Sequence, residues 1–188
     1  MDYCVPPIRI YSARGVKWGQ ESLPERPKGC FAQRLLTPFY AACPINLSGG
    51  VGGAFLLRYG TQAQIFLHDH LRQSGHRLAV PGTSVVTPSC GSPYTAIAHA
   101  VAIDVFYDTD ADRIFAAYCS GLEQLSNTCC QTVAAACLGC GYGRCSFDVF
   151  AAALKRLIVK PFSKIESVTL VTTNAELAAE IQKTLAAF

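Results

Sequence analysis

Residues 131–158, QTVAAACLGCGYGRCSFDVFAAALKRLI, place an apolar run, a glycine-rich segment and a helical pattern in immediate succession. The run at 131–138 is continuously apolar, which is typical of a β-strand covered on both faces. Glycine occupies every second position of residues 139–143. After Ser146, apolar residues recur at helical spacing, and this helical pattern ends near Pro161. The stretch therefore predicts a buried strand, a glycine loop and an amphipathic helix.

A second stretch repeats this order nearer the N-terminus. Residues 34–43, RLLTPFYAAC, predict a strand in which Pro38 indicates an edge or a bulge. The segment 43–60, CPINLSGGVGGAFLLRYG, has a glycine loop at 49–53, and the spacing of apolar residues from Thr61 onward predicts a helix. Two units of this kind favour a sheet with parallel strands, whose loops meet at one edge.

The rest of the chain continues the alternation of strands and helices. A loop without regular structure is expected at residues 16–33, where prolines, glycines and charges gather. Strands separated by helices of roughly ten to fifteen residues indicate an α/β layer fold with a largely parallel sheet. The other expected strands are 8–13, 83–87, 94–103 and 166–173, and further helices are expected after the capping segment 108–112 and after Asn174.

Length and composition favour one domain that spans residues 1–188. With 51% hydrophobic and 15% charged residues, the chain has enough apolar side chains for one substantial core and is not of a disordered type. The net charge of +3 comes from scattered basic residues, so no strong nucleic-acid partner is expected. No stretch approaches the length of about eighteen uncharged apolar residues that indicates a membrane span.

Ten cysteines raise three alternatives, which are disulfides, thiols and a zinc site. The opening segment MDYCVPPIRIYSARG has no apolar region of the secretory type, and Cys43 and Cys137 lie in apolar runs where a thiol behaves as a small hydrophobe. Thiols in a reducing, cytoplasmic compartment are therefore favoured. Cys137 and Cys140 form one short pair without a matching second pair, so no metal is expected.

Glycine-rich loops that precede helices suit the binding of phosphate. Glycine lets backbone amides approach an anion closely, and a helix start adds unpaired N–H groups and the positive end of the helix dipole. Neither loop is followed by the Gly-Lys-Ser/Thr of a P-loop, and GCGYGRC departs from G-x-G-x-x-G at the third glycine. A nucleoside triphosphate or a dinucleotide cofactor held in the usual way is therefore disfavoured, while a diphosphate ligand and a plain strand-to-helix turn both stay open.

Four segments, taken in order, resemble the macro domain, a family of ADP-ribose-binding modules. They are YAACPINLSGGVGGAFL, VPGTSVVTPS, YTAIAHAV and TVAAACLGCGYGRCSFDVFAAALKRLI, within residues 34–173. The first resembles the family's strand ending in asparagine with its glycine loop, the next two resemble its G-x-A-x-x-T and I-I-H-x-V strands, and the last resembles its second phosphate loop and helix. The compact type found in phages, viruses and bacteria is the most similar, since Cys43-Pro44-Ile45-Asn46 stands in the place of its S-P-A-N.

The resemblance implies a three-layer α/β/α sandwich with a mixed, mostly parallel central sheet. It places Asn46 and Tyr142 at the distal ribose, where the hydrolases of the family position the reacting group, and Thr173 and Asn174 on the adenine side. His99 matches a histidine that is mainly structural in the family. The implied ligand-binding residues of the glycine loops are Gly49, Gly50, Val51, Gly52 and Gly53 in the first loop and Gly139, Cys140, Gly141 and Gly143 in the second.

Two departures from the family pattern bear on activity. Some hydrolases of the family carry a water-activating aspartate in the first loop, but Gly52 stands nearest to that place and no acid lies between Cys43 and Asp69. Many members also have an adenine-reading aspartate after the first strand, for which Glu21 is only a loose substitute. The first departure weakens hydrolysis, and the second weakens tight binding of ADP-ribose.

Three functional hypotheses follow from the resemblance. The chain is a hydrolase that removes mono-ADP-ribose from proteins or cleaves O-acyl-ADP-ribose, a reader that binds ADP-ribose or ADP-ribosylated protein without cleavage, or a degenerate macro fold that serves as an interaction domain. No cofactor is expected, and a monomer is expected, in the host cytoplasm if the protein is viral. A Cys–His nucleophilic enzyme is disfavoured because no spacing singles out such a pair.

Overall fold

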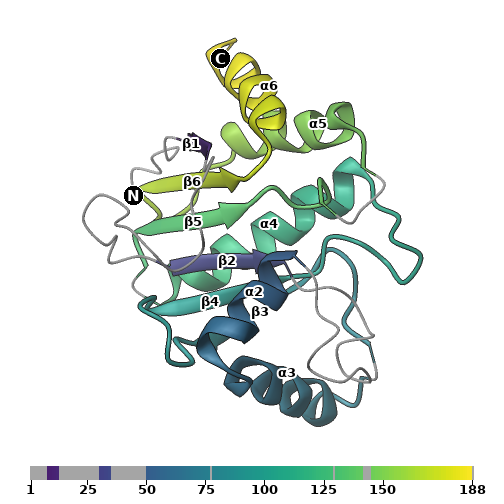
Figure 1. The fold of residues 1–188 in the computed structure, drawn as a ribbon, viewed down its shortest axis with the longest axis vertical. Coiled ribbons are helices and arrows are strands. Elements are labelled where there is room, and N and C mark those ends of the chain that lie inside the picture. The colour runs from purple at the N-terminus through teal and green to yellow at the C-terminus, as the bar shows by residue number, and fades with distance from the viewer. Residues whose placement is uncertain are drawn as a thin grey trace.

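The computed structural model describes residues 8–12, 30–34, 50–76, 78–128, 130–141 and 145–187. Strands and helices alternate along most of the chain, as Figure 1 shows. The strands are β1 (Ile8–Ser12), β2 (Cys30–Arg34), β3 (Ser84–Pro88), β4 (Ala96–Ala100), β5 (Thr132–Ala136) and β6 (Ser167–Thr172). The helices are α2 (Gly50–Tyr59), α3 (Gln62–Gln73), α4 (Ala111–Ser126), α5 (Phe147–Ile158) and α6 (Ala175–Ala186).

The strands that the structure describes form one mixed sheet with the order β1-β6-β5-β2-β4-β3. β3 runs antiparallel to β4 at one edge, and the other neighbouring strands are parallel. Parallel pairing places the carboxyl ends of β4, β2, β5 and β6 at the same side of the sheet, which is where the arrowheads of β5 and β6 lie in Figure 1. This mixed, mostly parallel sheet confirms the expected one.

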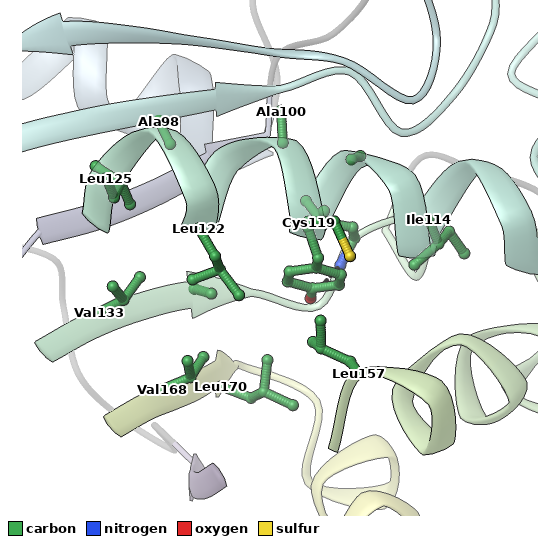
Figure 2. Packing of buried hydrophobic residues seen from close by; sticks show 14 of the residues in the cluster. Ala98, Ala100, Ile114, Cys119, Leu122, Leu125, Val133, Leu157, Val168 and Leu170 are labelled. Carbon is green, nitrogen blue, oxygen red and sulfur yellow. Dashed lines mark hydrogen bonds between the residues drawn. The ribbon is translucent and has the colours of Figure 1, made fainter. Parts of the chain in front are cut away.

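Helices cover both faces of the sheet. Side chains alternate in direction along a strand, so neighbouring residues of one strand pack against helices on opposite faces. On one face, Ala98 and Val133 pack with apolar residues of α4 and α5, as Figure 2 shows. On the other face, their neighbours Ile97 and Ala134 pack with Phe55 of α2. The sheet is therefore the middle layer of an α/β/α sandwich, as expected from the sequence.

The larger core lies between the sheet and the helices α4 and α5. Burial of each large apolar side chain there contributes about 1.5–3 kcal/mol to stability. Ile114, Leu122 and Leu125 from α4 and Phe150 and Leu154 from α5 are all less than 2% exposed. Because β5 and α5 both contribute residues to this core, the loop that joins them is held at both ends.

The first strand–loop–helix unit differs from the sequence expectation. A strand occupies Cys30–Arg34, and all of it except Arg34 lies in the segment 16–33 that was expected to be irregular. The expected strand 34–43 lies outside the described residues apart from Arg34. β2 pairs with β4 on one side and with β5 on the other, and such pairing with distant strands stabilises a segment whose local composition does not favour a strand.

The helix expected from Thr61 is preceded by another helix. α2 begins at Gly50, so most of the segment 49–53 belongs to a helix rather than to a loop. Glycine has low helix propensity, but Phe55 and Leu56 of α2 are buried, and their packing outweighs it. Within the described residues, none of the helices is long and apolar enough to cross a membrane.

Candidate functional site

The second glycine loop and the predicted adenine-side residues, Thr173 and Asn174, leave the sheet next to each other. β5 and β6 are parallel neighbours, and Ala136 at the end of β5 is paired with Val171 near the end of β6. The segments that follow, 137–141 and 173–174, therefore start side by side at the carboxyl edge of the sheet. Ligands of open α/β sheets bind at this edge, so the topology brings together two parts of the site that the sequence separates.

Gly139, the first residue of the second loop, cannot be replaced without strain. Its φ of +82° is in the left-handed region, which side-chain-bearing residues rarely adopt. A Cβ at this position would also lie 3.1 Å from Cδ1 of Ile114 and 3.3 Å from both Cγ2 of Thr109 and Cβ of Cys145. Glycine is needed here for its backbone conformation and for the close approach of three neighbouring side chains.

Tyr118 of α4 fixes the junction between β5 and the second loop. Its hydroxyl donates to the carbonyl of Ala136 at 2.7 Å and accepts from the N–H of Leu138 at 3.3 Å. The side chain is 3% exposed, and burial raises the pKa of the phenol well above its usual value, so the hydroxyl remains a donor at physiological pH. Sequence reasoning placed Tyr118 on the apolar face of a helix, but its polar role depends on which backbone groups face it.

The loop itself turns back immediately after the strand. The N–H of Cys140 donates to the carbonyl of Cys137 at 3.3 Å. The preceding connection, between β4 and α4, is tied down nearby, since Thr109 donates from Oγ1 to the carbonyl of Ala102 at 2.5 Å. Because Thr109 also touches the position of a Gly139 Cβ, the two loops at this edge support each other.

The start of α2 supplies the described part of the first glycine motif. Gly50, Val51, Gly52 and Gly53 form its first turn, which contains no acidic residue. Val51 packs against the cluster that includes Ala134 of β5, and α2 contacts β2. The first N–H groups of an α-helix have no partner within the helix, and the dipole there is positive. This turn is therefore suited to an anion.

Asn174, one of the two residues predicted to lie on the adenine side, has a structural role. Asn174 caps α6, and its Oδ1 accepts from the N–H groups of Glu176 at 2.9 Å and Leu177 at 3.2 Å. The backbone N–H of Asn174 donates to Oγ1 of Thr172 at 3.1 Å. Thr173 is exposed beside it. The oxygen of the Asn174 carboxamide is thus engaged by the helix cap, which leaves ligand contacts by this side chain to its nitrogen.

His99 is a structural residue, as the family resemblance implied. It lies on β4, is 2% exposed, and its Nε2 is 2.9 Å from Oγ1 of Thr87 on β3. Burial lowers the pKa of the imidazole to about 3, so the ring is neutral at physiological pH. A neutral ring that bonds to the neighbouring strand stabilises the β3–β4 pair.

Several predicted site residues are not among those that the structure describes. They are Asn46, Gly49, Tyr142 and Gly143, so their roles stay predictions. The described members of the predicted site fall into three groups at the start of α2, after β5 and after β6. Sequence reasoning missed Tyr118 and Thr109, which support the second loop from α4 and from the loop before it.

The cysteines are of two kinds. Cys137 and Cys145 carry thiols, as the sequence favoured, and Cys140 is likewise outside any disulfide. Cys130, by contrast, is in a disulfide, which corrects the expectation of thiols throughout. Among the described residues, no group of three or more His, Cys, Asp or Glu side chains is placed to hold a metal ion.

Comparison with known proteins identifies the family. The sequence model of the Macro domain matches residues 41–154. A mutant Oceanobacillus iheyensis macrodomain with ADPR has a similar fold, with a TM-score of 0.74 and 17% identity over 100% of this chain and 96% of that chain. A Trypanosoma brucei macrodomain in complex with ADP has a TM-score of 0.62 and 14% identity over 83% of this chain and 62% of that chain. The macrodomain of Mycobacterium tuberculosis DarG has a TM-score of 0.61 and 12% identity over 90% of this chain and 99% of that chain.

No curated protein matches the sequence. The structural similarities are at low identity and show the fold, whereas the family model covers more than half of the chain. β5, Gly139, the first part of α5 and the buried histidine on β4 lie inside the matched residues. The chain belongs to the macro domain family.

Proposed function

We propose that the chain binds ADP-ribose, or a ligand that contains it, at the carboxyl edge of the sheet. The observation that carries the proposal is the second glycine loop, in which Gly139 has a left-handed φ and Tyr118 ties down the junction with β5. The N–H of Cys140 is engaged by the carbonyl of Cys137, so the amides that follow in a loop fixed in this way would hold a diphosphate. Two solved structures with the same fold contain ADPR or ADP, which supports this ligand class.

The order of the strands suits an elongated ligand. β2, β5 and β6 are consecutive in the sheet, and neighbouring strands lie about 4.8 Å apart, so the distance from β2 to β6 is on the order of 10 Å. The start of α2 would hold the distal ribose and a phosphate, the loop after β5 would hold the diphosphate, and Thr173 and Asn174 would contact the adenosine. Each end of the ligand thus meets a different strand end.

Calorimetric titration with ADP-ribose tests this proposal. Gly139→Ala adds a Cβ to the crowded left-handed position and is expected to weaken binding at least tenfold. Gly75→Ala is the matched control, because Gly75 also has a left-handed φ (+71°) but nothing within 4 Å of its Cβ position. Circular dichroism confirms that both variants are folded. Absence of heat with the unmodified protein at millimolar ADP-ribose, or equal affinities of a folded Gly139→Ala variant and the control, would refute the proposal.

Hydrolysis of a mono-ADP-ribosyl or O-acyl linkage is a second candidate at the same site. The first turn of α2 contains no acidic residue that could take a proton from water. Water would therefore be activated by a phosphate of the ligand itself, with Asn46 and Tyr142 as the positioning groups that the family resemblance implies. A turnover assay on mono-ADP-ribosylated protein decides between the two: release of ADP-ribose that is lost in Asn46→Ala supports a hydrolase, and saturable binding without release supports a reader.

A further inference from the structure

Two cysteines that flank the second glycine loop interact with each other. Cys140 and Cys145 are both half-buried, and a hydrogen bond joins the Cys140 side chain to the Cys145 sulfur. Cβ of Cys145 also lies 3.3 Å from the Cβ position of Gly139, the residue just before Cys140. The chain therefore returns to within side-chain contact of itself after the loop, and it does so at the two cysteines.

Its surroundings make Cys145 more reactive than Cys137, the cysteine that directly follows β5. The hydrogen bond from Cys140 lowers the pKa of the Cys145 thiol, and this effect exceeds that of burial, which raises it; the backbone N–H of Phe150 also lowers it. When protonated, the thiol donates to the carbonyl of Ser146 at 3.2 Å. Cys145 also stands just before Ser146, the N-cap of α5, where the helix dipole favours a thiolate. Burial raises the pKa of the Cys137 thiol to about 12, so this neighbour stays protonated and unreactive.

We propose that Cys140 and Cys145 form a redox-sensitive pair that a small disulfide such as oxidised glutathione joins into an intramolecular disulfide. The Cys145 thiolate attacks one sulfur of glutathione disulfide, whose S–S bond breaks and releases one glutathione thiolate. The Cys140 thiol then loses its proton and attacks the Cys145 sulfur of the mixed disulfide, which releases the second glutathione. Two protein thiols are oxidised and one glutathione disulfide is reduced to two glutathione molecules.

The disulfide would change the loop that is proposed to hold the diphosphate, and this part rests on the proposed function. Forming the bond brings the two sulfurs from hydrogen-bond distance to about 2.05 Å. The bond would close a ring from Cys140 to Cys145 beside Gly139, whose Cβ position is 3.3 Å from Cβ of Cys145. The proposed phosphate-binding amides of Gly141 and Gly143 lie in this closed ring, and we expect oxidation to weaken ADP-ribose binding at least tenfold, with recovery on reduction.

Thiol mapping of the full chain tests the pair without any ligand. The folded protein is treated with oxidised glutathione, remaining thiols are alkylated, and peptides are identified by mass spectrometry. We expect a disulfide between Cys140 and Cys145 while Cys137 is alkylated. Cys140→Ser should accumulate one glutathione on Cys145, because the resolving thiol is gone. Cys145→Ser should react much more slowly, and Cys137→Ser, the matched control, should behave as the unmodified protein.

Different outcomes separate the two parts of the proposal. Failure to form the internal disulfide under these conditions, or equally fast formation of a different one, overturns the pair; Cys145→Ala and thermal melting show whether a serine variant has merely unfolded. Equal ADP-ribose affinities of the oxidised and reduced protein overturn the effect on binding. If the reduced protein binds no ADP-ribose, the proposed function fails, and the peptide map still decides whether the thiol pair exists.

Discussion

Tyr118→Phe is the most direct test of how the second loop is held in place. The substitution keeps the buried ring and removes only the hydroxyl, so no large cavity forms. It deprives two buried backbone groups, the carbonyl of Ala136 and the N–H of Leu138, of their partner. The 2.7 Å bond to the carbonyl dominates, because the 3.3 Å bond is long and weak. Leaving a buried polar group unsatisfied costs about 1–3 kcal/mol.

Chemical denaturation measures this loss as a lower free energy of unfolding, and thermal melting measures it as a lower Tm. For a chain of this size, about 1–3 kcal/mol corresponds to a decrease in Tm of about 2–12 °C. Tyr107→Phe is the matched control, since Tyr107 is 45% exposed, and surface substitutions usually change stability by less than about 0.5 kcal/mol. ADP-ribose binding should weaken several-fold only in Tyr118→Phe. Equal stabilities of the two variants would refute the role of the hydroxyl.

Two further predictions concern the supporting residues. Burial lowers the pKa of His99 from 6.5 to about 3, so between these pH values the unfolded chain binds a proton that the folded chain does not. The free energy of unfolding should therefore fall as the pH falls from 6.5 towards 3, by up to about 1.4 kcal/mol per pH unit. Denaturation across this range should show a smaller slope for His99→Gln, and an unchanged slope would contradict the burial of a neutral ring. Asn174→Ala removes the cap of α6 and should lower the free energy of unfolding by about 0.5–2 kcal/mol. The control Thr173→Ala changes an exposed neighbour and should leave the free energy of unfolding nearly unchanged. Similar losses in both variants would contradict a capping role.

The second strand–loop–helix unit was predictable because local and long-range preferences agree there. The apolar run at 131–138 contains β5, and the helical pattern behind Ser146 contains α5. β5 is covered on both faces, as a continuous apolar run requires, and α5 turns its apolar side to the main core. The prediction of the glycine loop between them needed no knowledge of distant residues.

The first unit was harder because its helix start resembles a loop. Glycines at 50, 52 and 53 lower helix propensity, and the residues that stabilise α2 by packing, such as Phe55, contact strands far away in the sequence. β2 likewise owes its place to pairing with β4 and β5. Local composition contains neither contribution, so the sequence predicted an irregular loop where most of β2 lies and a glycine loop where α2 begins.

The sequence predicted that the two glycine motifs lie close together only if both preceding strands are central and parallel. The pairing of β2 with β5 meets that condition, and it has a chemical consequence. Both motifs are proposed to hold a phosphate by backbone N–H groups, and the first turn of α2 contains no acidic side chain that would repel it. A site of this kind attracts a diphosphate without supplying a general base, because the same missing carboxylate favours the anion and removes the proton acceptor. In the proposed site, the absence of an acid in this turn would strengthen binding of the diphosphate and weaken catalysis at the same time.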